Sequence, residues 1–154
     1  MSRRVFRTAV RVLAALVVLG AGTAAVRGPC GPDLRVAVED PAPVPAGGTT
    51  VVHATVVNVG DVPTVGPFSL VVQLPPGVVG TGLAPADCST GPFGHTVTCT
   101  VPAGLAVDGS VTADVRLGVA SGTDPGTLDG TVQADLPGDP RPADNSAHFA
   151  VAVK

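Results

Sequence analysis

The chain has 154 residues, and nine Lys and Arg stand against twelve Asp and Glu, a formal net charge of −3. So few basic residues argue against a nucleic-acid-binding protein, because phosphate contacts need clustered Lys and Arg. Aromatic residues make up 3% of the chain and Trp and Tyr are absent, so a core must come from Val, Leu and Ala. Twenty Gly and sixteen Pro argue against long helices.

The first residues have the three parts of an export signal. Arg3, Arg4, Arg7 and Arg11 give a basic start, residues 12–26 are uncharged, and small residues at positions 23–25 suit a peptidase. This run of fifteen residues is shorter than the roughly twenty that span a membrane. We therefore expect a cleaved signal peptide at residues 1–25, a short flexible segment at 26–32, one domain at 33–154, and no membrane span after cleavage.

The route of export stays open. Residues 2–6 resemble the twin-arginine motif, although an ordinary positive start explains the same arginines. Cleavage would remove four of the nine basic residues and no acid, leaving a net charge of −7. We expect a secreted or cell-surface protein, in an environment where disulfides persist.

Alternation of apolar and polar residues dominates the chain after Pro32 and predicts strands. The strands are expected at residues 34–39, 49–58, 68–74, 96–101, 111–119, 128–136 and 149–153. A single apolar face on each strand indicates two antiparallel sheets packed against each other. We expect an all-β fold, an immunoglobulin-like antiparallel β-sandwich of about seven strands.

The stretch from Pro75 to Gly94 falls between two of these strands and is expected to be a long loop. It is apolar at Val78, Val79 and Leu83. An apolar loop held at its base by a disulfide would suit contact with another protein. We therefore expect the interaction site here.

Several short motifs occur in a characteristic order and together suggest a family. They are Asp33-Leu34, Ala46-Gly47-Gly48-Thr49, Asn58-Val59-Gly60, Leu74-Pro75-Pro76-Gly77, Thr96-Val97-Thr98-Cys99-Thr100 and Asp144-Asn145-Ser146. In these motifs, residues 33–153 resemble the conserved repeat domain of bacterial surface proteins, which is close to the cell-adhesion-related bacterial (CARDB-like) domain. The resemblance implies an immunoglobulin-like sandwich in secreted or wall-associated proteins, without catalytic activity.

Three cysteines allow three single pairings. Cys88–Cys99 is favoured, because a turn-rich segment separates the two and Cys99 shares its face with Val97 and Val101. Two reduced core thiols are the alternative. Cys30, between Gly and Pro residues, would then be left over and could tether the protein through an intermolecular disulfide. It could equally lie upstream of the true cleavage site or have no role.

No catalytic constellation is visible. The serines lack a nucleophile-elbow motif, and the three histidines lack the spacing of a zinc site and are expected on surfaces or strands. Asp135, Asp139 and Asp144, with Asn145, could supply oxygen ligands to calcium, although Asp and Asn are also ordinary turn residues.

The sequence thus predicts a non-catalytic module without a cofactor, binding another protein or a wall component. The alternative is a secreted calcium- or small-ligand-binding protein that uses the loop from Asp135 to Asn145.

Overall fold

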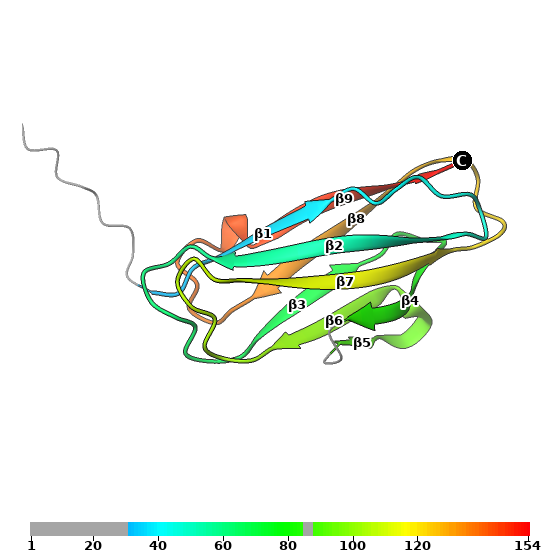
Figure 1. Ribbon diagram of the computed structural model, residues 1–154. Helices are drawn as coiled ribbons and strands as arrows, with labels where there is room; N and C mark the ends of the chain where they lie inside the picture. The colour runs from blue at the N-terminus through cyan, green and yellow to red at the C-terminus, as the bar shows by residue number, and fades with distance from the viewer. Residues whose placement is uncertain (1–30, 85–87) are drawn as a thin grey trace, which may run out of the picture.

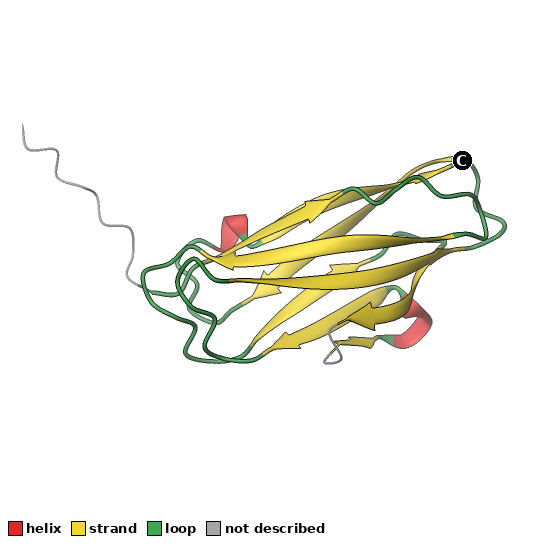
Figure 2. Cartoon of the chain, viewed as in Figure 1, coloured by secondary structure: helices red, strands yellow, loops and turns green. Residues whose placement is uncertain are grey.

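The computed structural model describes residues 31–84 and 88–154, and both the predicted signal peptide and Cys30 lie outside this part. The described chain forms nine strands and two short helical turns (Figure 1). The strands are β1 (Leu34–Glu39), β2 (Thr49–Asn58), β3 (Phe68–Gln73), β4 (Val78–Ala84), β5 (Cys88–Thr90), β6 (Thr96–Val101), β7 (Ser110–Val119), β8 (Gly126–Asp135) and β9 (Ser146–Val153). The turns are η1 (Pro92–Gly94) and η2 (Pro142–Asp144), at opposite ends of the sandwich (Figure 2).

Two antiparallel sheets pack face to face, one with the strand order β1-β2-β7-β4 and the other with the order β5-β6-β3-β8-β9. The prediction of an all-β, immunoglobulin-like antiparallel sandwich is confirmed. The chain enters at one end of the long axis, and Lys154 lies at the other end (Figure 1). None of the helices in the described chain has the length and apolarity needed to cross a membrane.

All seven predicted strands are present, because strict alternation places one apolar face of each against the other sheet. In β2, for example, Val52, Ala54 and Val56 are fully buried, while His53 between them is exposed and Thr55 is partly exposed. Val, Leu and Ala supply most of the core, and its two aromatic residues are Phe68 and Phe149. A sandwich core is therefore built almost without aromatic side chains.

The segment from Pro75 to Gly94 differs from the expected long loop, because it contains β4, β5 and η1. Val78 is fully buried in the core rather than offered to a partner. Alternation did not predict β4, because Gly80 and Gly82 interrupt its pattern and a register shift between them marks a bulge. Strand β5 has only three residues, too few to show a period.

Candidate functional site

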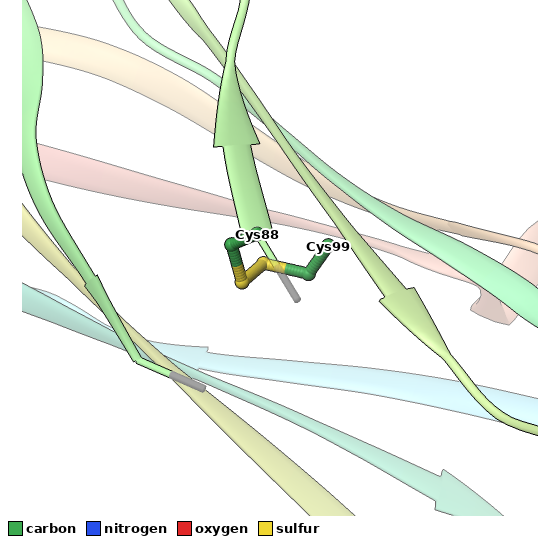
Figure 3. Close-up of a disulfide and its surroundings, with 2 residues drawn as sticks. All are labelled: Cys88 and Cys99. Carbon is green, nitrogen blue, oxygen red and sulfur yellow. A yellow bond between two sulfur atoms is a disulfide. The ribbon is translucent and has the colours of Figure 1, made fainter. Parts of the chain in front are cut away.

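Cys88 in β5 and Cys99 in β6 are directly opposed across the two strands and form a disulfide (Figure 3). The bond joins the three-residue edge strand β5 to a strand that is paired on both sides. Cys99 is buried among the core residues, and Cys88 packs against them. The bond therefore fixes the outer edge of the five-stranded sheet.

The three predicted metal ligands do not form one group. Asp135 ends β8, exposed and opposite Ser69 of β3. Asp139 uses both carboxylate oxygens on backbone groups, accepting from the N–H of Leu34 and of Arg141 at 2.8 Å each. Asp144 lies in η2, 3.8 Å from Nε of Arg35. Within residues 31–84 and 88–154, no group of three or more His, Cys, Asp or Glu side chains is arranged to hold a metal ion.

Arg141 lies in the connection between β8 and β9, immediately before η2. Its Nε donates to Oδ2 of Asp33 at 2.6 Å, and its Nη2 pairs with the same oxygen. The hydrogen bond to Asp33, and then the charge of Asp33, raise the pKa of Arg141 above its ordinary value. The charges of Asp144 and Asp139 raise the pKa further.

Sequence reasoning missed both Asp33 and Arg141 as partners, because 108 positions separate them. In the sequence, Asp33 belongs only to the motif Asp33-Leu34, yet in the structure it is almost completely buried. An acidic residue at the start of an apolar strand was the available signal, since a buried carboxylate needs a partner.

The histidines are dispersed over the sandwich. His53 lies in β2 and His148 in β9, which belong to different sheets. Nδ1 of His53 pairs with Asp114 of β7 at 2.7 Å, and Nδ1 of His95 hydrogen-bonds the carbonyl oxygen of Val78 at 2.8 Å. The histidines thus lie on strands or in a loop, as expected from the sequence, and His53 and His95 each contact a neighbouring group of the sandwich.

The outer faces of the two sheets differ in charge. The outer face of β1-β2-β7-β4 carries Arg35, Glu39, His53, Asp114 and Arg116, with Glu39, His53 and Asp114 in one row across three strands. On β5, β6 and β3, the outer residues of the five-stranded sheet include no ionisable side chain, and we call them the uncharged face. Its members are Ser69, Val71, Gln73, Ser89, Thr96, Thr98 and Thr100.

One row of the uncharged face also has uncharged neighbours on β8 and β9, as far as the other edge of the sheet. Ser89 lies opposite Thr98, Thr98 opposite Val71, and Val71 opposite Gln133 of β8, which in turn faces Ser146 of β9. The nearest acids on this outer side are Asp129 and Asp135, both on β8. A row without an ionisable side chain thus crosses all five strands, with Val71 as its one apolar member among hydroxyl and amide groups.

Phe93 lies in η1, at the end of the β5–β6 hairpin, and its side chain is 89% exposed. Its backbone has a φ of 70°, in the left-handed region that a bulky residue rarely adopts. Beside η1, residues Gly77, Val79, His95, Gly118, Val119 and Ala120 line a shallow hollow of about 380 Å³. The segment expected to be the interaction site therefore does present one exposed aromatic side chain.

Comparison with solved structures supports the fold. A cohesin module of a family 33 glycoside hydrolase from Clostridium perfringens matches with a TM-score of 0.59 and 9% identity, over 80% of this chain and 98% of that one. A CARDB domain from Pyrococcus furiosus matches with a TM-score of 0.53 and 18% identity, over 80% and 89%. The cohesin of a type I cohesin–dockerin complex from Clostridium thermocellum matches with a TM-score of 0.51 and 12% identity, over 79% and 99%.

No family model and no curated protein matches the sequence. At these identities the likeness defines the fold, an immunoglobulin-like β-sandwich of the kind found in cohesin and CARDB domains.

Proposed function

We propose that this protein is a non-catalytic, exported interaction module that binds another protein or a wall component through its uncharged face. The observation that carries the proposal is the difference between the two sheets. The outer face of the four-stranded sheet carries charged residues on β1 and β7, whereas the ionisable residues on the outer face of the five-stranded sheet, Asp129, Asp135 and His148, lie on β8 and β9. Strands β5, β6 and β3 therefore present no ionisable side chain. Depletion of charge is a property of interface cores, because burying an unpaired charge is costly.

The side chains of this face suit rapid, reversible contact. Ser and Thr are short and lose little conformational entropy on binding, and their hydroxyls both donate and accept hydrogen bonds. A rigid sheet held at its edge by the disulfide would present them without reorganisation. The partner would therefore be a polar, uncharged surface such as a protein loop or a glycan of the wall.

Two further features are consistent with this function. The exposed Phe93 lies at the end of the β5–β6 hairpin and would add an apolar anchor at the margin of the interface. One structural neighbour is a cohesin solved in complex with a dockerin, so this type of sandwich serves protein recognition in that case. Export would follow from the predicted signal peptide at residues 1–25, and Cys30 would add a covalent link if its predicted intermolecular disulfide forms.

A charge placed on either sheet tests the proposal. Thr98→Lys introduces a cation at the centre of the uncharged face, and Thr112→Lys introduces one on the outer face of β7. Both residues are outward-facing strand threonines, Thr98 between β5 and β3 and Thr112 opposite Thr55 of β2, so the two changes are alike in kind. Binding of the purified protein to cell envelopes should be lost in the first variant and retained in the second. Equal retention in both variants would refute the assignment of the face.

A further inference from the structure

Three buried side-chain oxygens lack a hydrogen-bond donor at the end of the sandwich where η2 packs against β1. They are Oδ1 of Asp33, Oδ1 of Asp144 and Oδ1 of Asn145. Asp33 is 3% exposed and Asn145 is 4% exposed, so bulk water does not reach them freely. Buried acceptors without a partner are costly, and such groups in folded proteins are usually met by a donor, a water molecule or a cation.

The residues that carry these oxygens belong to one cluster around Arg141. Oδ2 of Asp33 is paired with the guanidinium, and the backbone N–H of Asp144 in η2 donates to the carbonyl oxygen of Arg141 at 3.2 Å. Asn145 follows Asp144 directly, and its backbone carbonyl accepts from the N–H of Ala134 at 2.8 Å, which fixes its position against β8. The three oxygens therefore belong to two neighbouring segments that the Asp33–Arg141 ion pair joins.

The charge of the cluster is not balanced. Asp33, Asp139 and Asp144 contribute three carboxylates, whereas Arg35 and Arg141 contribute two guanidinium groups. Asp139 already uses both oxygens on backbone N–H groups. The cluster therefore has one carboxylate more than it has guanidinium groups.

These unmet groups are all oxygens, which favours a hard divalent cation over zinc, because zinc prefers nitrogen and sulfur ligands. Calcium fits better than magnesium, since it accepts irregular geometry and completes its coordination with water. The set contains two carboxylates and one amide, so it differs from the groups of three titratable ligands that the described residues lack.

We propose that calcium binds at this end of the sandwich through Oδ1 of Asp33, Asp144 and Asn145, in competition with the guanidinium of Arg141. The Arg141 side chain is 50% exposed and would turn into solvent when the ion enters. The ion would then join the start of β1 to the β8–β9 connection in place of the ion pair. This site is separate from the uncharged face and does not depend on its function.

The test is calcium titration of the whole chain, by calorimetry and by thermal unfolding, in about 0.15 M NaCl so that diffuse surface attraction is screened. Calcium should raise the melting temperature of the wild type, and magnesium should act more weakly. Arg141→Gln should melt lower in chelator and bind calcium roughly tenfold more tightly, because pairing with Arg141 no longer reduces the competent fraction. Asp144→Asn should lose binding.

Asp135→Asn is the matched control, because Asp135 is an exposed acid of β8 outside the cluster. It should bind calcium as the wild type does. The proposal is overturned if neither the wild type nor Arg141→Gln responds to calcium, which would leave the three oxygens to water. It is also overturned if Asp135→Asn weakens binding as much as Asp144→Asn. Neither result would affect envelope binding through the uncharged face, which is measured separately.

Discussion

The ring of Phe149 in β9 occupies the space above Gly130, its Cα partner in the neighbouring strand β8. A Cβ atom at position 130 would lie 2.7 Å from two carbon atoms of the ring edge. Glycine is therefore required at this point of β8, because Phe149, the largest fully buried side chain among the described residues, covers it.

Gly130→Ala should destabilise the fold by about 2 kcal/mol, since the core is closely packed and the ring must move. Urea denaturation measures the change, and Phe149→Leu in the same chain should recover part of the loss. Gly122→Ala is the matched control, because an added Cβ there meets nothing within 4 Å. Equal effects of the two glycine substitutions would contradict this packing relationship.

Asn58, at the end of β2, is fully buried and makes four hydrogen bonds with its side chain. Its Nδ2 donates to the carbonyl oxygens of Val62 and Leu105, and its Oδ1 accepts from the N–H groups of Asp33 and Gly60. One amide thus joins three loops at the end of the sandwich.

Asn58→Leu keeps the size of the side chain but leaves three backbone groups without a partner, since the carbonyl oxygen of Leu105 still accepts from the N–H of Thr64. It should cost about 3 kcal/mol in the free energy of unfolding. Chemical denaturation gives the value. The exposed Thr100→Ala should change it by less than about 0.5 kcal/mol. A loss below about 1 kcal/mol in Asn58→Leu would mean that water replaces the amide at little cost.

The Cys88–Cys99 disulfide closes a short loop, with a sequence separation of 11. Its removal in a Cys88→Ala, Cys99→Ala double variant should cost about 3 kcal/mol, chiefly by releasing the unfolded chain. Denaturation of the oxidised, reduced and double-variant proteins checks this value. If reduction leaves stability unchanged, the bond does not hold the edge strand β5.

Phe93 and Val65 are both 89% exposed, but of the two only Phe93 has a left-handed backbone. Phe93→Asn should raise stability by about 1 kcal/mol, because Asn tolerates this conformation better. It should also weaken envelope binding if Phe93 anchors the interface. Val65→Asn removes a similarly exposed apolar side chain without relieving strain, so it should leave stability unchanged. A stability gain in both variants would show that exposure, not backbone strain, is responsible.

Sequence alone predicted the strands whose residues alternate, as in the run from Val111 to Val119 of β7, because period two directly reports which face is buried. It did not predict β4, where glycines and a bulge replace alternation. Alternation also gives faces and not neighbours. The row from Ser89 through Thr98 and Val71 to Gln133, which defines the uncharged face, therefore required the strand order.

Partners close in the sequence could be predicted from it, and partners far apart could not. The Cys88–Cys99 pair spans 11 residues and turn chemistry made it the favoured pairing, whereas Asp33 and Arg141 meet only because β1 packs beside the β8–β9 connection. Of the residues named in the calcium prediction, Asp144 and Asn145 lie at the end of the sandwich where η2 packs against β1, whereas Asp135 lies on the outer face of the sheet. Calcium binding itself stays a prediction.

Hydrogen exchange of the protein bound to isolated cell envelopes, compared with the free protein, tests the central proposal most directly. The account predicts added protection of backbone amides in β5, β6 and β3, beneath the uncharged face, and little change in β1 and β2. Protection confined to β1, β2 and β7 would contradict it and would assign binding to the charged face.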